Sequence, residues 1–227
     1  MPPNSSLSSK LTIKLAPVDP LDNDLLHFFH LIISTSCRKE SEQFSHPFFA
    51  SSIKPMVSME LITQQLLLRP FQKADVEPLF QIQRDQEAMQ FTFNVQNMEE
   101  SEHYLTTHAE QRDIVGFAPW TVCLKEDKTV IGWGGLMEDP FDPGYGPEVA
   151  YFFNKGYWGK GLGTELVKAS IDYGFRQLKL DVIGAFARPE NQASIRVLEK
   201  CGFSYKSYNT IIERNYYQIT SDTIRPN

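Results

Sequence analysis

The stretch WGKGLGTEL, Trp158 to Leu166, places three glycines directly before a predicted helix. A glycine-rich turn at a helix N-terminus exposes backbone N–H groups that have no partner within the helix, and the helix dipole adds partial positive charge. Such a site binds anions, phosphate groups among them. Lys160 is followed by Gly161 rather than Ser or Thr, which does not fit a P-loop. Thr164 stands where the dinucleotide fingerprint requires glycine.

Regular elements must lead into this loop and out of it. The residues PEVAYFFN predict a strand from Pro147 to Asn154 that delivers the chain into the glycines. Apolar residues at helical spacing predict an amphipathic helix over Gly161–Leu178. A strand that is apolar on both faces follows at Leu180–Ala187, and a further helix at Asn191–Lys200. The anion site is therefore expected at a junction of strand, loop and helix.

The other segments complete a mixed domain. We predict a strand within the stretch ELITQQLLLRPF, which runs into Arg69 and Pro70. Asp75 stands where an N-cap would open the first helix, and Asn97 with Glu100 three residues later marks the second. The predicted ranges are helices over Asp75–Met89 and Asn97–Arg112, two strands around a polar turn at Glu126–Thr129, and a terminal antiparallel pair at Phe203–Tyr208 and Ile211–Ile219.

Composition narrows the class of protein. The 227 residues carry a formal net charge of −6 with a pI near 5.4, and no basic run is present, which argues against a nucleic-acid partner. No apolar run reaches the length of a membrane span, and the N-terminus lacks the pattern of a secretory signal. We therefore expect a cytoplasmic protein that does not insert in a membrane. Residues 1–58 are rich in Ser and Pro and predict a loosely packed extension to a domain over 59–227.

A second motif follows the glycine loop. RPENQASIRVLEKCGF lies about thirty residues after WGKGLGTEL, and the two together resemble the GNAT acetyltransferase superfamily, in particular its RimJ/RimL-like branch, which acetylates protein N-termini. The resemblance covers Glu60 to Ile219. It implies an α/β (α+β) fold with a mixed, strongly twisted, mostly antiparallel sheet, helices on both faces and a splayed central strand pair. The implied reaction is direct acetyl transfer from acetyl-CoA to a primary amine, with a protein N-terminal α-amine or a small amine as acceptor.

The resemblance also implies a set of cofactor-binding residues. The glycine loop would bind the pyrophosphate of acetyl-CoA through backbone amides, and the edge of the preceding strand would pair with the pantetheine arm. Asn191 is implied as a side-chain partner of pantetheine, and its type equally fits a helix cap. The implied cofactor residues are Val149, Ala150, Tyr151, Phe152, Phe153, Gly159, Lys160, Gly161, Leu162, Gly163, Thr164 and Asn191.

Two catalytic residues are implied in the same way. RimJ/RimL-like proteins often carry a glutamate at the position of Glu148, which makes it the first choice for the general base; Glu138 and Asp139 are alternatives. Many family members protonate the leaving thiolate with a tyrosine seven residues after the motif asparagine, where this sequence has Leu198. Ser194 matches the serine of the RimJ/RimL-like pattern and could take that role.

The missing tyrosine leaves a second reading open, an acyl-CoA-binding or regulatory module that has lost turnover. The aromatic residues Phe91, Phe93, Phe117, Trp120 and Trp133 border the acceptor side in this family, and core packing is the stronger expectation for them. The histidines and cysteines show no metal-ligand spacing, so no metal is predicted. We expect a monomer or a homodimer.

Overall fold

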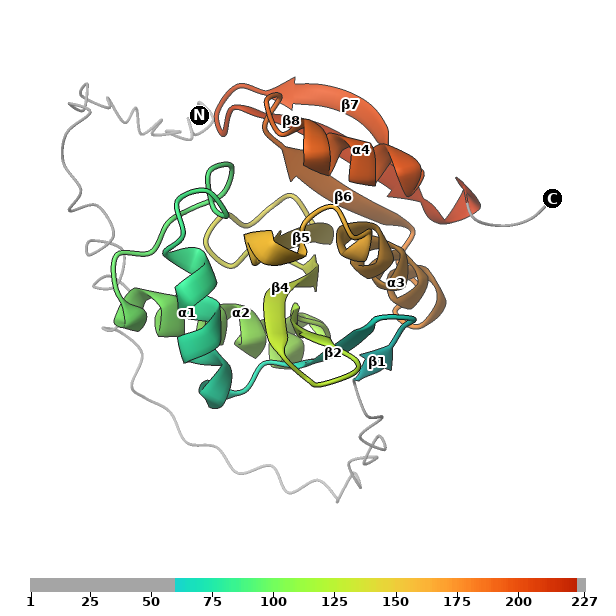
Figure 1. The fold of residues 1–227 in the computed structure, drawn as a ribbon. Helices are drawn as coiled ribbons and strands as arrows, with labels where there is room; N and C mark the ends of the chain where they lie inside the picture. Colours follow the sequence, from blue (N-terminus) through green and yellow to red (C-terminus); the bar gives the residue numbers. More distant parts are fainter. Residues whose placement is uncertain (1–59, 224–227) are drawn as a thin grey trace, which may run out of the picture. The chain divides into compact units, whose positions relative to one another are not determined.

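A computed structural model of the chain describes residues 60–223, so the predicted N-terminal extension lies outside the described residues. The described part forms one eight-stranded sheet in the order β1-β2-β3-β4-β5-β6-β8-β7, with four α-helices (Figure 1). The strands are β1 Leu61–Ile62, β2 Leu66–Pro70, β3 Trp120–Leu124, β4 Val130–Met137, β5 Glu148–Phe153, β6 Val182–Ala187, β7 Ser204–Asn209 and β8 Arg214–Thr220. The helices are α1 Val76–Gln83, α2 Met98–Val115, α3 Leu162–Arg176 and α4 Gln192–Lys200.

The sheet has one parallel pair. All neighbouring strands run antiparallel except β5 and β6, which share a single register pair, Glu148 with Gly184. Beyond that pair the two strands diverge, and β6, β8 and β7 continue the sheet together with α4 above β5 in Figure 1. The predicted mixed, mostly antiparallel sheet with a splayed central pair is confirmed.

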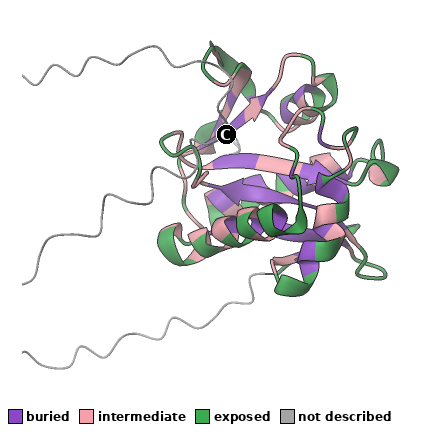
Figure 2. Cartoon of the chain, turned by 90° about the vertical axis from the view of Figure 1, so that its left-hand side faces the viewer, coloured by how far each residue is buried: buried purple, intermediate pink, exposed green. Residues whose placement is uncertain are grey.

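Helices cover both faces of the sheet. Figure 2 shows the buried strands between helices whose outer surfaces are exposed. On one face α3 and α4 pack against the strands, and on the other α1 and α2 pack against β4 and β5. The first face buries Leu166, Val167, Ile171, Ile195 and Leu198 from its helices, and the second buries Leu79, Ile82 and Leu105 with Trp133 and Phe152 of the sheet.

A bulge on β4 lets side chains of that strand pack in the cores on both faces of the sheet. The register with β3 shifts between Val122 and Cys123, whose partners are Gly132 and Val130, so Ile131 has no partner of its own. An extra residue in one strand breaks the strict alternation of side chains. As a result Ile131 packs in the cluster with α3, while Trp133, two residues later, packs in the cluster with α1 and α2.

The segment 60–71 differs from the prediction of one strand. It forms a hairpin in which β1 pairs with β2, with Leu61 opposite Leu68. The turn closes because Thr63 N–H donates to the Leu66 carbonyl at 2.9 Å. Glu165 on α3 also fixes this turn, accepting from the backbone N–H of Gln65 at 2.7 Å. The polar TQQ triplet was the sequence signal for this break in the strand.

Asp75 precedes α1, as predicted, but its side chain does not cap that helix. The carboxylate is 3% exposed and binds the guanidinium of Arg69 through two contacts of 2.6 and 2.7 Å. It also accepts from the Gln72 backbone N–H and from the Thr121 hydroxyl, both at 2.8 Å. This network joins α1 to β2 and β3.

Candidate active site

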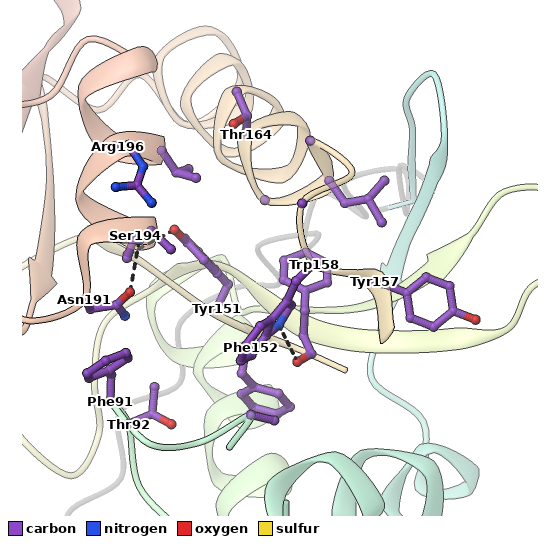
Figure 3. A pocket seen from close by; sticks show the side chains of 18 of the residues that line it. Phe91, Thr92, Tyr151, Phe152, Tyr157, Trp158, Thr164, Asn191, Ser194 and Arg196 are labelled. Atoms are coloured by element: carbon purple, nitrogen blue, oxygen red, sulfur yellow. Dashed lines mark hydrogen bonds between the residues drawn. The ribbon is translucent and has the colours of Figure 1, made fainter. Parts of the chain in front are cut away.

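A cavity of about 460 Å³ lies along β5, where that strand diverges from β6 (Figure 3). Its walls come from β5, the turn that follows it, the first turn of α3, the length of α4, and a segment between α1 and α2 that includes Phe91 and Thr92. Most residues of the predicted cofactor set line this cavity: Tyr151, Phe152, Phe153, Gly159, Gly161, Leu162, Gly163, Thr164 and Asn191, together with the predicted catalytic Ser194.

The glycine loop opens α3 with backbone that glycine alone adopts easily. Gly159 and Gly161 have φ angles of +73° and +81°, in the left-handed region, and a Cβ built on either would meet no atom within 4 Å. The first helical hydrogen bond runs from the Glu165 N–H to the Gly161 carbonyl. The preceding N–H groups of the first turn therefore have no helical acceptor, and the residues that carry them line the cavity. The loop has the geometry and charge of an anion site.

Positive side chains border the same cavity. Arg196 and Lys200 line it from α4. Lys160 does not line it; its ammonium lies over the ring of Tyr157, 4.8 Å from the centroid. An anion in this cavity would thus share it with two cationic side chains.

The open edge of β5 presents backbone groups to the cavity. The Pro147 carbonyl accepts from the Gly184 N–H of β6 at 2.9 Å, and the Phe153 carbonyl accepts from the Trp158 indole at 3.2 Å. Both carbonyls point away from β4, and backbone direction alternates along a strand. The polar groups of Val149 and Tyr151 therefore face the same way, beyond the last pair with β6. An extended chain bearing amides could pair with this edge.

Tyr151 connects this edge to α4. Its side chain points toward Ser194 in Figure 3, and the two hydroxyl oxygens are 3.1 Å apart. Burial raises the pKa of Tyr151 to about 12, although the hydrogen bond with Ser194 opposes that rise. Ser194 is oriented in turn by its backbone N–H, which donates to the Asn191 side chain at 3.0 Å. Asn191 therefore caps α4, and its amide nitrogen is still available as a donor.

A second cavity, of about 400 Å³, lies along the N-terminal part of β5, from Glu148 to Phe152. Tyr151, Phe152 and Thr92 line both cavities and so form their shared wall. The second cavity is lined by Val149 and Ala150 of the predicted cofactor set, by the predicted base Glu148 and its alternative Asp139, and by several aromatic rings; Glu138 does not line it.

Glu148 has the most strongly altered chemistry at this site. Glu148 is only 8% exposed. Burial and the neighbouring carboxylates of Asp139 and Asp142 raise its pKa to about 8, and the charge of Arg214 opposes this rise. A carboxyl group with a pKa near neutrality can exchange protons with an amine whose pKa is similar. Carboxylates that are shifted by burial and by a like charge within a cavity are typical of functional sites.

His108 lies behind Asp139, fully buried. Its Nδ1 is 2.9 Å from the Tyr104 carbonyl, so Nδ1 carries the proton, and Nε2 is 3.7 Å from the Asp139 carboxylate without a hydrogen bond. Burial lowers the pKa of His108, which keeps the ring neutral at pH 7. His108 therefore makes no hydrogen bond to Asp139, and it does not line the second cavity.

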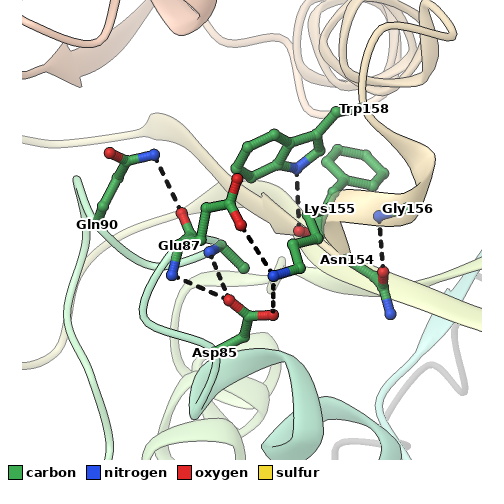
Figure 4. Close-up of polar contacts among 9 residues, drawn as sticks. Asp85, Glu87, Gln90, Asn154, Lys155, Gly156 and Trp158 are labelled. Carbon is green, nitrogen blue, oxygen red and sulfur yellow. Dashed lines mark hydrogen bonds and ion pairs between the residues drawn. The ribbon is translucent and has the colours of Figure 1, made fainter.

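A salt-bridge cluster ties the two sides of the first cavity together (Figure 4). Lys155, in the turn after β5, binds Asp85 at 3.1 Å and Glu87 at 2.9 Å. The segment that follows these carboxylates carries Phe91 and Thr92 into the cavity wall. These ion pairs are partly exposed, so they add little stability, but they fix where that wall lies.

The aromatic residues of the sequence analysis divide between core and cavity. Phe117 and Trp120 pack in the cores on the α3 face, as expected. Phe91 lines the first cavity and Phe93 the second, and Trp133 is both buried and part of the second cavity's wall.

Two features of the site were absent from the sequence analysis. Tyr151 was named for its backbone only, whereas its hydroxyl lies beside Ser194; Leu198, at the usual tyrosine position, is buried in the core. Arg214, at the start of β8, was not named, although it lines the second cavity. The only sequence signals were an isolated charge at a strand start and a tyrosine in an apolar strand.

Residues 60–223 contain neither a metal-binding cluster nor a membrane-spanning helix. No group of three or more His, Cys, Asp or Glu side chains there could hold a metal ion. None of the helices in this part of the chain combines the length and apolarity needed to cross a membrane.

Sequence comparison identifies the domain. The family model of the acetyltransferase (GNAT) domain matches residues 65–204. A Bacillus licheniformis protein named "Uncharacterized N-acetyltransferase p20" is 29% identical over 153 residues, which cover 63% of this chain and 81% of that protein. "Uncharacterized N-acetyltransferase YnaD" of Bacillus subtilis is 26% identical over 150 residues, 66% of this chain and 85% of that protein.

Solved structures share the fold. An acetyltransferase from Agrobacterium tumefaciens has a TM-score of 0.62 and 20% identity, covering 80% of this chain and 99% of that chain. RimL, titled a ribosomal L7/L12 alpha-N-protein acetyltransferase in complex with coenzyme A, has a TM-score of 0.61 and 17% identity, covering 72% of this chain and 98% of its own. Because the family model spans more than half of the sequence, the chain belongs to the GNAT acetyltransferase family and is one of its N-acetyltransferases.

Proposed function

We propose that this protein transfers the acetyl group of acetyl-CoA directly to a primary amine. The observation that carries the proposal is the meeting of two cavities at Tyr151 and Phe152. One cavity has an anion-binding helix start and an open strand edge, and the other has a buried carboxyl group with a pKa near 8. A thioester at the shared wall would have the rest of its CoA carrier in the first cavity and would face an amine in the second.

The residues around the first cavity fit acetyl-CoA. The N–H groups of Gly161, Leu162, Gly163 and Thr164 would bind the pyrophosphate, with the backbone of Gly159 and Lys160 completing the loop. The bare Cα atoms of Gly159 and Gly161 leave room that a side chain would fill. The pantetheine amides would pair with the edge of β5, whose residues are Val149 to Phe153, and could accept from the free amide nitrogen of Asn191.

The chemistry follows from charges that change during transfer. The amine nitrogen forms a bond to the carbonyl carbon, the carbon–sulfur bond breaks, and the proton released by nitrogen passes to the Glu148 carboxylate, directly or through water. The developing oxyanion needs a donor, which a backbone N–H on the open edge of β5 can provide. The departing thiolate takes the Ser194 proton, and the Tyr151 hydroxyl orients or replenishes the serine hydroxyl.

The branch and the acceptor remain part of the proposal. Structures that share the fold are titled RimL, a ribosomal L7/L12 alpha-N-protein acetyltransferase, ribosomal-protein-S5-alanine acetyltransferase and aminoglycoside acetyltransferase. The sequence motifs and the carboxylates of the second cavity support the RimJ/RimL-like branch and an amine acceptor for this chain, either a protein N-terminal α-amine or a small amine.

The first prediction concerns Tyr151 and Ser194. Tyr151→Phe and Ser194→Ala should each lower kcat about tenfold, a change of about 1.4 kcal/mol, and leave the affinity for acetyl-CoA unchanged. The effect is modest because a thiolate with a pKa near about 8.5 is a fair leaving group. Since the two hydroxyls act as a unit, the double variant should be no slower than the slower single variant.

Steady-state rates and separate acetyl-CoA titrations measure these effects. Tyr205→Phe is the matched control, because Tyr205 is 55% exposed on β7 and lines neither cavity. Full activity in Tyr151→Phe, or additive losses in the double variant, would remove Tyr151 from the mechanism.

The second prediction concerns the glycine loop. Acetyl-CoA at about 100 times its dissociation constant stabilises the folded protein by about 2.7 kcal/mol, which raises the melting temperature measurably. Gly161→Val should abolish that rise, because a β-branched residue is strained at φ +81° and its side chain enters the space next to the loop amides.

Gly116→Val provides the control. Gly116 ends α2 at φ +93° with no atom within 4 Å of a built Cβ, and it lines neither cavity. That variant should melt at a lower temperature than wild type and still respond to acetyl-CoA. Equal responses in Gly161→Val and wild type would show that the cofactor binds elsewhere. Binding without turnover in wild type would instead support the reading of an inactive acyl-CoA-binding module.

A further inference from the structure

Acidic and basic side chains lie on different sides of the second cavity, where β5 and β6 diverge. The carboxylates of Asp139, Asp142 and Glu148 come from the β4–β5 side. On the other side, β8 begins with Arg214, which lines the cavity, and Arg188 follows β6. Burial lowers the pKa of Arg214, and the charge of Arg188 lowers it further, so the two guanidinium groups are close enough to repel each other. The second cavity therefore has an acidic wall of three carboxylates and a basic wall made by Arg214; Arg188 lies near Arg214 but does not line the cavity.

Arg214 lacks a partner of its own among the residues that the structure describes. Within residues 60–223 its guanidinium makes no hydrogen bond and no ion pair within 4.0 Å, whereas Arg188 is 3.9 Å from Glu213. Glu148 acts on Arg214 only through the longer-range attraction of their charges. A half-buried guanidinium presents planar donors that match the two oxygens of a carboxylate. In a cavity that served amines alone, a second cation would weaken binding.

The remaining walls are aromatic. Phe93, Trp133, Phe141, Tyr145 and Phe186 surround the space between the acidic and basic walls. A volume of about 400 Å³ is within the range of small-molecule sites. The occupant should therefore be small, should carry both charges, and should have an apolar group large enough to contact the rings.

We propose that the acceptor is a free α-amino acid with an aromatic side chain, an inference that rests on the proposed function. Its ammonium would face Glu148 and Asp139, its carboxylate would bind Arg214, and its ring would contact the aromatic walls. Glu148 takes the amine proton as the nitrogen–carbon bond forms, as in the general mechanism. A protein N-terminus fits less well, because its first carbonyl is neutral and would leave the Arg214 charge uncompensated.

Three probes with the same ring and amine test this assignment: L-phenylalanine, its amide, and 2-phenylethylamine. In wild type, kcat/KM should fall about 10- to 100-fold from phenylalanine to 2-phenylethylamine, since a hydrogen-bonded charge is lost. Arg214→Gln should remove that preference and Arg214→Lys should keep part of it. The ratio of the two substrates is the readout, because Arg214 also affects the pKa of Glu148 and so alters the rate with every amine.

Arg176→Gln is the control, since Arg176 is exposed on α3 and, within the described part of the chain, forms an ion pair only with Asp172 on the same helix. Isothermal titration of phenylalanine into the CoA complex gives a second readout that needs no turnover. Arg214-dependent binding without thiol release would uphold the amino-acid site and contradict the proposed function. Turnover that prefers 2-phenylethylamine, or the amide over phenylalanine, would overturn the amino-acid assignment and leave acetyl transfer standing, with the amide result favouring a peptide N-terminus. Absence of both preference and binding for phenylalanine at millimolar concentration would also overturn the assignment.

Discussion

Glu148→Gln should lower turnover by about 10²- to 10⁴-fold, the range of general base catalysis, with little change in acetyl-CoA affinity. Glutamine keeps the shape of the side chain and its hydrogen-bonding capacity but cannot accept the amine proton. Glu148 lines the second cavity and not the first, so the glycine loop and the rest of the first cavity should be unaffected. Rates at saturating acetyl-CoA, together with a binding titration, measure both parts.

The pH profile gives the same prediction a sharper form. With a pKa of about 8, Glu148 is mostly protonated in the free enzyme at neutral pH, so kcat/KM should rise with pH until it levels above about 8. An arriving ammonium favours the ionised carboxylate and lowers this pKa in the complex. The variant's residual rate should follow the ionisation of the amine alone.

The free energy of unfolding should fall with rising pH, whereas kcat/KM rises. The ordinary pKa of 4.5 applies to Glu148 in the unfolded chain, and the folded value is about 8, so between these values the folded state binds one more proton. Wild-type stability therefore falls as pH rises from 4.5 to about 8, and Glu148→Gln does not share that loss. Melting temperatures should be similar near pH 4.5 and higher for the variant at pH 9.

If Glu148→Gln lowers turnover by less than about threefold, the general base is Asp139 or solvent and not Glu148.

Asp75→Asn should lower the free energy of unfolding by about 3 kcal/mol, because it removes a buried charge that neutralises the partly buried guanidinium of Arg69. Burial alone would raise the pKa of Asp75, but hydrogen bonds from Arg69, Gln72 and Thr121 lower it below the ordinary value of 3.8. The contribution of Asp75 is thus present above pH 3.8 and is lost as pH falls through the lower folded value. The difference between wild type and variant should shrink in that acidic range.

Urea unfolding at pH 7 measures this effect, with Asp127→Asn as the matched control. Asp127 is exposed and accepts a hydrogen bond from the Thr129 backbone N–H, so its replacement should cost under about 1 kcal/mol. The double variant Arg69→Met with Asp75→Asn should lose less free energy of unfolding than the sum of the losses in the two single variants, since no unpaired charge remains. Strict additivity would mean that the two side chains do not stabilise the fold as a pair.

The sequence was sufficient for the features that depend on local pattern. The strand Glu148–Phe153, the glycine turn and the helix from Leu162 follow one another in the chain, and each has its own periodicity, so the prediction of these elements is confirmed. The hairpin at Leu61–Pro70 was predicted as one strand, because a two-residue strand has too few residues to show alternation.

Contacts across the splay could not be predicted in this way. The hydrogen bond between Tyr151 and Ser194 depends on how far β6 and α4 move away from β5, which no local pattern records. The approach of Arg214 to Glu148 depends on the β6–β8 pairing and has the same origin. The sequence also could not show that the Asp75 side chain does not cap α1, because that side chain binds Arg69 of β2 and Thr121 of β3.

The most direct test of acetyl transfer is a stoichiometric assay on the purified protein with acetyl-CoA and L-phenylalanine. Free thiol should appear only when both substrates are present, and mass spectrometry should find one N-acetylated amine for each thiol released. Glu148→Gln protein at the same concentration should release thiol at least about 100 times more slowly. Thiol release at the same rate without amine, or no release with phenylalanine, 2-phenylethylamine or N-terminal peptides, would contradict the proposed enzyme activity.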